Sequence, residues 1–168
     1  LGEAYYKQFN FSSSNIVMSN MYGPLDHFEI ERSHALGALI LKIYNAKKNN
    51  IGFIAIWGTG KPIREWLYVK DGAESLIRAL ELEPGHHFFN VGSGQGYSVI
   101  EIANKIAKEF KWDGEFKLDT SKPDGVLEKK VNPKLGETIL NWSPKTTIDE
   151  GIKLTVEWFI ENEKNITQ

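Results

Sequence analysis

The sequence predicts a mixed α/β fold, or α+β for this chain taken alone. Apolar stretches typical of strands alternate with amphipathic stretches typical of helices along the 168 residues, and this alternation is characteristic of α/β and α+β proteins. Two helix starts have a capping-box pattern, Ser98 with Glu101 and Thr147 with Glu150. With 41% apolar and 25% charged residues, the chain has an ordinary globular composition. We therefore expect one domain with a real core.

Hydrophobic periodicity places the elements in order. Leu36, Leu39, Ile40 and Ile43 fall on one helical face, which predicts a helix from about Ser33, with Ser33 as its N-cap. The terminal helix directs Ile148, Ile152, Val156, Phe159 and Ile160 inward. The predicted elements are a helix end at 1–9, a strand at 15–20, a loop at 21–33, a helix at 33–49, strands at 52–57 and 64–69, a helix at 70–82, a strand at 86–91, a helix from 98, a strand at 114–119, a polar loop at 120–131 and a helix from 147.

Composition excludes several classes of site. The chain has no cysteine, which excludes disulfides, thiolate metal ligands and a cysteine nucleophile. Its 20 basic and 22 acidic residues are mixed along the chain, so we expect no nucleic-acid partner. No apolar run approaches the roughly 18 residues of a membrane span. His86 and His87 are adjacent in a predicted strand and would face opposite sides, so we expect no metal site.

The stretch "NVGSGQGYSVIEI" places glycines between a strand and a helix. The dinucleotide fingerprint G-x-G-x-x-G would need glycine at position 97, where the chain has Tyr97. A tight turn that requires positive φ is the favoured interpretation, and phosphate binding is the alternative.

Arg64 and Glu65 stand in the middle of an otherwise aromatic and aliphatic stretch, directly before "WLYV", in "WGTGKPIREWLYVKD". The turn "GTGKP" would bring Trp57 close to Arg64, and an aromatic face beside a guanidinium suits a ring stacked near a diphosphate. Glu65 could orient Arg64 for that purpose. In the alternative, Arg64 simply pairs with Glu65 or Asp71.

Two further stretches each have a structural and a functional interpretation. "SKPDG" is by default an ordinary turn, but Lys122, with Lys129 and Lys130 after it, could bind a phosphorylated ligand. His34, at a predicted helix start, is either a surface histidine or a residue beside a bound anion.

Together, "NMYGP", "SHALGALILK", "WGTGKPIREWLYVKD", "FNVGSGQGYSVIEIA" and "DTSKPDGVLEKK" resemble the C-terminal part of the extended short-chain dehydrogenase/reductases, the NAD-dependent epimerase/dehydratase family. Within it, the chain is most similar to the GDP-L-fucose synthase group. The resemblance spans nearly all 168 residues. It implies a substrate-binding C-terminal domain, 1–168, that includes the last elements of the Rossmann domain, about 1–20 and parts of 52–91.

The resemblance also implies that different parts of the enzyme bind the cofactor and the substrate. The glycine-rich loop that binds NADP or NAD, and the catalytic Tyr-x-x-x-Lys pair, would lie upstream of "LGEAYYKQF", so this chain alone would be inactive. Residues along the nicotinamide end of the cofactor would be Met18, Ser19, Asn20 and Met21. His34 would lie close to the cofactor and act as an acid during epimerisation. Substrate-binding residues would be Lys42, Trp57, Arg64 and Lys129, and the functional interpretation of "SKPDG" adds Lys122.

Some positions depart from the fucose synthase pattern. Lys42, Glu115 and Glu128 stand where those enzymes have Arg, and Asn132 replaces Asp, so the resemblance leaves the nucleotide open. The implied substrate is a nucleotide-diphosphate sugar, with 3,5-epimerisation and 4-keto reduction of a GDP-4-keto-6-deoxy-hexose. The alternatives are a 4-epimerase, a 4,6-dehydratase or a non-catalytic sugar-nucleotide-binding module. We further expect a cytoplasmic homodimer with no membrane partner.

Overall fold

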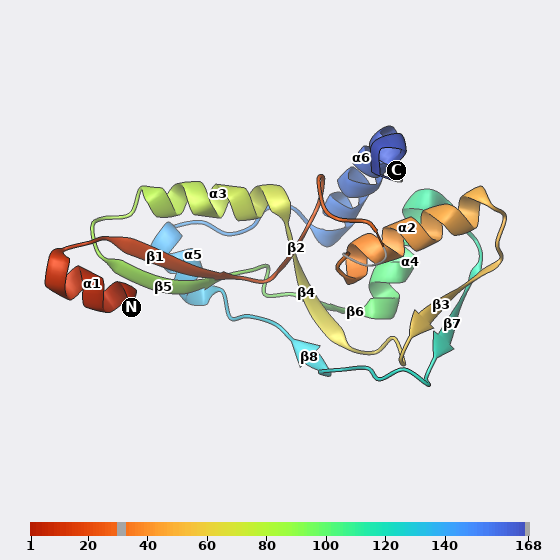
Figure 1. The fold of residues 1–168 in the computed structure, drawn as a ribbon, viewed down its shortest axis with the longest axis horizontal. Coiled ribbons are helices and arrows are strands. Elements are labelled where there is room, and N and C mark those ends of the chain that lie inside the picture. Colours follow the sequence, from red (N-terminus) through yellow and green to blue (C-terminus); the bar gives the residue numbers. More distant parts are fainter. Residues whose placement is uncertain (30–32, 167–168) are drawn as a thin grey trace. The chain divides into compact units, whose positions relative to one another are not determined.

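The computed structural model describes residues 1–29 and 33–166 and has the alternation of helices and strands that the sequence predicts. Figure 1 shows the elements along the chain. The helices are α1 (Gly2–Phe9), α2 (Ala35–Lys48), α3 (Val69–Leu80), α4 (Val99–Phe110), α5 (Lys134–Leu140) and α6 (Ile148–Ile166). The strands are β1 (Ser13–Met18), β2 (Asn20–Tyr22), β3 (Phe53–Trp57), β4 (Ile63–Tyr68), β5 (His86–Val91), β6 (Gly96–Ser98), β7 (Glu115–Asp119) and β8 (Glu128–Lys129).

Parallel pairing dominates the described strands. β1 pairs with β5, from Ser13 opposite His86 to Met18 opposite Val91. β3 pairs in parallel with β7, and β4 with the short β8. A further ladder has the order β2-β4-β6. Parallel strands joined through helices are the pattern of α/β proteins, so the predicted fold class is confirmed.

The chain divides into two compact units. Unit 1 comprises 1–21, 65–95 and 130–146. Unit 2 comprises 22–64, 96–129 and 147–168, of which 30–32 and 167–168 lie outside the described residues.

Unit 1 is built on the β1–β5 pair, whose strands run side by side in Figure 1. Side chains alternate along β5, so that Phe89 and Val91 are buried while Phe88 is exposed. The buried cluster also includes Leu67, Leu140 and Trp142. α5 packs against β5 and completes this core.

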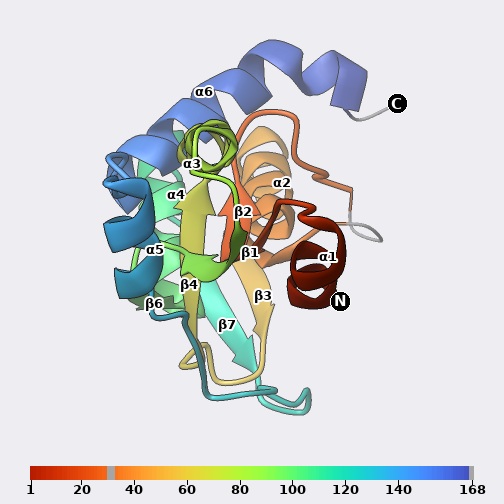
Figure 2. The ribbon, with the colours of Figure 1, turned by 90° about the vertical axis from the view of Figure 1, so that its left-hand side faces the viewer.

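Unit 2 has its core between helices α2, α4 and α6 and the β3–β7 pair (Figure 2). Phe159 of α6 lies at its centre, with ring centroids 4.9 Å from Phe28, 5.2 Å from Tyr44 and 6.4 Å from Phe110. The predicted capping box of α4 is confirmed, because the Ser98 and Glu101 side chains each bond the other's backbone nitrogen.

Several local predictions differ from the structure. β1 begins at Ser13 rather than 15, and the predicted loop at 120–131 contains β8. The N-cap of α2 is His34 rather than Ser33, because Ala38 N donates to His34 O and the helix starts at Ala35. Ile160 is 50% exposed, whereas Thr155 is buried and donates its hydroxyl to Gly151 O. Within 1–29 and 33–166, every helix is too short or too polar to cross a membrane.

Candidate functional site

Unit 2 contains a cleft of about 360 Å³ alongside α2. α2 presents one face to it, because its lining residues are spaced at i, i+3, i+4 and i+7. The lining comprises Ala35, Ala38, Leu39 and Lys42 of α2, Ala55, Ile56 and Trp57 of β3, and Ser33, Val99, Pro123 and Asp124.

Trp57 stands at the end of β3 with two lysine ammonium groups near its ring. Strand alternation buries Ile54 and Ile56 and leaves Trp57 68% exposed. Lys42 Nζ lies 5.7 Å from the indole centroid and Lys122 Nζ lies 5.8 Å from it. Both are within cation–π range, and an aromatic face with two cations suits a stacked ring that carries phosphate groups. Three of the predicted substrate-binding residues therefore come together.

Asp124 fastens the "SKPDG" turn to the "GTGKP" turn. Its Oδ1 accepts from Thr59 N at 2.6 Å, and its Oδ2 accepts from Thr59 Oγ1 at 2.7 Å. The Thr59 hydroxyl, and then its N–H, hold the pKa of Asp124 below its ordinary value. Gly58, at φ +76°, leaves room for this contact, because a Cβ there would lie 2.1 Å from Asp124 Oδ1. No local pattern predicts this pairing, because Asp124 and Thr59 lie 65 positions apart.

Arg64 and Lys129 are neighbours on the β4–β8 pair, where they are register partners. Arg64 is half-buried, and its Nη1 donates to Ile63 O at 2.8 Å. Its Nη2 approaches the "SKPDG" turn, because a Cβ built on Gly125 would lie 3.9 Å from it. Arg64 and Lys129 are not among the residues that line the cleft. Their predicted role in substrate binding stays a prediction.

Glu65 has a structural role within unit 1. It is fully buried, and its carboxylate accepts from Gly94 N at 3.0 Å and from Val131 N at 2.8 Å. Asp71, the other carboxylate proposed for Arg64, accepts from Thr146 N at 3.0 Å. Because successive side chains of a strand face opposite sides, the expectation that Glu65 orients Arg64 is wrong.

The glycine-rich stretch after β5 is a tight turn. Gly94 has φ +69°, and its N–H is used by the Glu65 carboxylate. At Gly92, a Cβ would lie 2.1 Å from Glu65 Oε1, so only glycine fits beside that carboxylate. These contacts favour the turn interpretation over a phosphate-binding loop.

The residues predicted to contact the cofactor lie at the end of β1 and the start of β2 in unit 1. Ser19 N donates to Val91 O at 3.0 Å, and Asn20 Nδ2 donates to Glu65 O at 2.9 Å. Met18 is half-buried, and Met21 is 42% exposed. Ser19 Oγ is buried and has no hydrogen-bond partner among the described residues. A buried hydroxyl without a partner fits a position that contacts a polar group of a ligand.

His34 is exposed at the N-cap of α2, between Ser33 and Ala35 of the cleft lining. Its ring does not line the cleft, and its side chain makes no capping hydrogen bond. An exposed imidazole beside a cleft can still exchange protons with a bound substrate.

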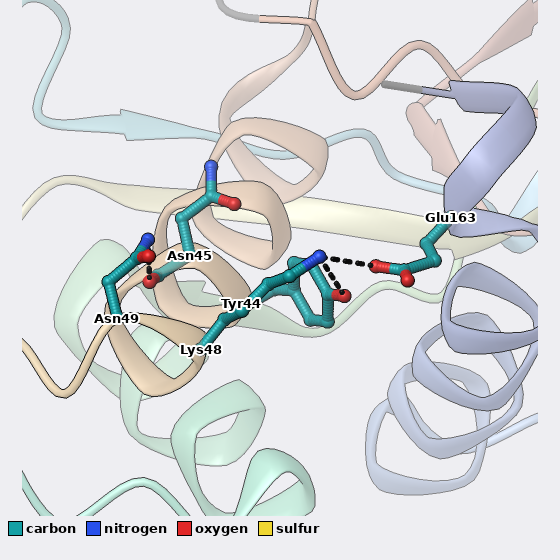
Figure 3. A network of polar contacts seen from close by, with 5 residues as sticks. All are labelled: Tyr44, Asn45, Lys48, Asn49 and Glu163. Atoms are coloured by element: carbon teal, nitrogen blue, oxygen red, sulfur yellow. Dashed lines mark hydrogen bonds and ion pairs between the residues drawn. The ribbon is translucent and has the colours of Figure 1, made fainter. Parts of the chain in front are cut away.

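The chain contains one Tyr-x-x-x-Lys spacing, Tyr44 and Lys48. We had expected the catalytic pair to lie upstream and had not considered these two residues. Figure 3 shows Lys48 Nζ between Tyr44 Oη, at 3.2 Å, and Glu163 Oε2, at 3.3 Å. At about 100° per residue, Tyr44 points about 160° away from Lys42 around the α2 axis, and so away from the cleft. This pair links α2 to α6, and its position does not fit catalysis at the cleft.

Comparison with known proteins finds one matching family and several similar relatives. A sequence profile of the NAD dependent epimerase/dehydratase family matches residues 1–92. A probable GDP-L-fucose synthase 1 of Oryza sativa is 37% identical over 161 residues, which are 95% of this chain and 48% of the relative. A GDP-L-fucose synthase of Sinorhizobium fredii is 35% identical over 96% of this chain and 51% of its own length.

A solved structure has the same fold. The GDP-L-fucose synthetase of Naegleria fowleri bound to NADP superposes with a TM-score of 0.85 at 28% identity, over 92% of this chain and 47% of that one. The chain thus spans about half the length of the relatives it matches.

Proposed function

Because the chain belongs to the NAD-dependent epimerase/dehydratase family, we propose that unit 2 is the substrate-binding part of a nucleotide-sugar epimerase and reductase. Unit 1 then corresponds to the last elements of the Rossmann domain, since it contains 1–21 and 65–95. This assignment agrees with the ranges that the sequence predicts, about 1–20 and parts of 52–91.

The reaction that we propose is 3,5-epimerisation and 4-keto reduction of a GDP-4-keto-6-deoxy-hexose. Relatives named GDP-L-fucose synthase support it, at 37% and 35% identity over nearly the whole chain. The observation that carries the proposal is the cleft lined by Lys42 and Trp57, with the ammonium groups of Lys42 and Lys122 both near the Trp57 ring. Trp57 would stack on the nucleotide, and the two ammonium groups would bind its phosphates.

The departure at Glu115 does not oppose a diphosphate at this cleft. Glu115 does not line the cleft, and its register partner is Phe53, four residues from Trp57 along β3. At about 3.3 Å per strand residue, that separation is about 13 Å. The Glu115 carboxylate is therefore too far from Trp57 to repel a diphosphate bound there directly.

Separate residues would serve the cofactor and the acid step. Ser19, Asn20 and the neighbouring methionines would contact the nicotinamide end of NADP or NAD, and the free Ser19 hydroxyl supports this role. When bound, the cofactor supplies the hydride that reduces the 4-keto group. His34 would donate a proton at a sugar carbon during epimerisation. The homodimer and the cytoplasmic location stay predictions from the family resemblance.

Thermal unfolding of the chain with GDP, UDP, CDP and dTDP tests the choice of nucleotide. A ligand that binds only the folded state raises its stability, so GDP should raise the melting temperature most. Equal shifts for all four nucleotides would contradict the assignment to GDP-sugars. No shift with any of them would contradict a nucleotide-sugar site.

The His34→Gln variant tests the proposed acid in the active, full-length protein. A positioned acid or base contributes about 10²–10⁴-fold, so solvent deuterium should enter the sugar carbons at least about 100 times more slowly. Binding of NADP, measured in parallel, should be unchanged. Deuterium incorporation at the rate of the unmodified protein would show that His34 is not the acid.

A further inference from the structure

The segment that carries Lys122 is tied to the neighbouring turn at two places. At its start, Gly58 N donates to Asp119 O at 2.8 Å. At its end, the Asp124 carboxylate accepts both hydrogen bonds from Thr59. Lys122 lies between these two attachments. We call the pair of Asp124–Thr59 hydrogen bonds the latch.

Judged by charge alone, a carboxylate is not expected at position 124, because the proposed ligand is an anion. It lines a cleft whose other charged lining residue is Lys42, and Lys122 reaches the same indole ring. A negative charge at such a site repels an anionic ligand. Its two oxygens, however, are directed to the N–H and hydroxyl of Thr59. The hydrogen bonds from Thr59 therefore explain why an aspartate stands at position 124.

We propose that Asp124 is a positioning residue for the diphosphate, which holds Lys122 beside Trp57 through the latch to Thr59. This inference rests on the proposed function of the cleft and assigns the role of one further residue in it. Without the latch, Lys122 would sit on a freer turn. It would then lose conformational freedom when it binds a phosphate, which weakens binding.

Calorimetric titration with GDP separates geometry from charge. Asp124→Ala removes both the latch and the negative charge, and we expect about tenfold weaker binding, because a hydrogen bond to a charged group is worth about 1.5–3 kcal/mol. Asp124→Asn removes only the charge. Its amide can still accept from Thr59 N and donate to Thr59 Oγ1, so it should bind GDP at least as well as the unmodified chain.

The partner residue supplies the second test. Thr59→Val removes the hydroxyl and should weaken GDP binding, whereas Thr59→Ser keeps the hydroxyl and should not. In the double variant, Thr59→Val should add little to Asp124→Ala, because both changes break the same contact. If Asp124→Ala binds GDP as tightly as the unmodified chain, the latch has no positioning role. If both Asp124 variants bind weakly while Thr59→Val is unaffected, Asp124 contacts the ligand itself, and the proposal is wrong.

Iodide quenching of Trp57 fluorescence tests the latch without any nucleotide. Trp57 is more exposed than Trp66, Trp112 and Trp142, which are 6–8% exposed, and a Trp57→Phe variant supplies the background. Iodide gathers near cations, and both Asp124 variants lack the carboxylate charge, so Asp124→Ala should show less quenching of Trp57 than Asp124→Asn as Lys122 moves away. Equal quenching in Asp124→Ala and Asp124→Asn overturns the latch. A difference between them without GDP binding to the unmodified chain overturns the proposed function instead.

Discussion

Glu65 Oε1 lies 3.0 Å from the backbone nitrogen of Gly94, at the turn that follows β5. Its other oxygen accepts from Val131 N at 2.8 Å, so one buried carboxylate joins β4 to two segments distant in sequence. This contact explains why an acidic residue stands in β4, directly before the apolar "WLYV". The two N–H groups lie in irregular backbone, where strand pairing does not supply acceptors.

Replacement of Glu65 should destabilise the fold. Glu65→Ala leaves two N–H groups without their acceptor, and we expect the free energy of unfolding to fall by about 2–3 kcal/mol. Glu65→Gln should also lower it, since an amide nitrogen would face an N–H donor at one of the two sites. Urea denaturation measures both variants, with Glu81→Ala on the exposed end of α3 as the control. A Glu65→Ala variant as stable as that control would contradict this role.

Acid should loosen the Asp124–Thr59 latch. The pKa of Asp124 is lowered in the folded chain, so its contribution to stability is fully present above its ordinary value of 3.8. It is lost as the pH falls through the lower, folded-state pKa. The stability difference between the unmodified chain and Asp124→Ala should therefore be constant from about pH 7 to 4 and shrink below that. Urea titrations across this range would contradict the latch if the difference did not depend on pH.

Local sequence predicts the elements better than the contacts between them. β5 and the start of α4 fall where alternation and the Ser98 capping box place them, because both signals are contained in a few adjacent residues. The two-residue β8 is held by its pairing with Ile63 and Arg64, which the local sequence does not encode. The same holds for Asp124 and Thr59, whose side chains meet only in the folded chain. Trp57 and Lys122 could be proposed for the site because the residue types in and beside the two turns suit a phosphorylated ligand, and the family resemblance supported Trp57.

Removal of the Tyr44–Lys48 contact should leave catalysis intact. Lys48 is 57% exposed, and ion pairs at such positions contribute at most about 1 kcal/mol. In the full-length protein, Lys48→Met should therefore lower the melting temperature only slightly and leave kcat unchanged. Steady-state kinetics decide the matter. A loss of turnover as large as that expected for a catalytic lysine would mean that Tyr44 and Lys48 take part in catalysis.

Arg64 should bind a diphosphate rather than stabilise the fold. Lysine reproduces its charge but not its forked geometry, so Arg64→Lys should weaken GDP binding less than Arg64→Ala, which should lose about tenfold or more. Neither change should lower the melting temperature much, because the Glu65 and Asp71 carboxylates accept from backbone N–H groups. Titration and thermal unfolding of the same samples check both points. A destabilised Arg64→Ala with normal affinity would assign Arg64 a structural role.

Calorimetric titration of GDP into the unmodified chain and into Lys42→Ala tests the proposed cleft most directly. Lys42 lines the cleft, with its ammonium group 5.7 Å from the Trp57 ring centroid. Lys108, exposed on α4 of the same unit and absent from the cleft lining, gives the matched control Lys108→Ala. We predict that GDP binds the unmodified chain and Lys108→Ala alike, and Lys42→Ala about tenfold more weakly. Equal affinity of all three for GDP, or no binding to any, would contradict a nucleotide-sugar site at this cleft.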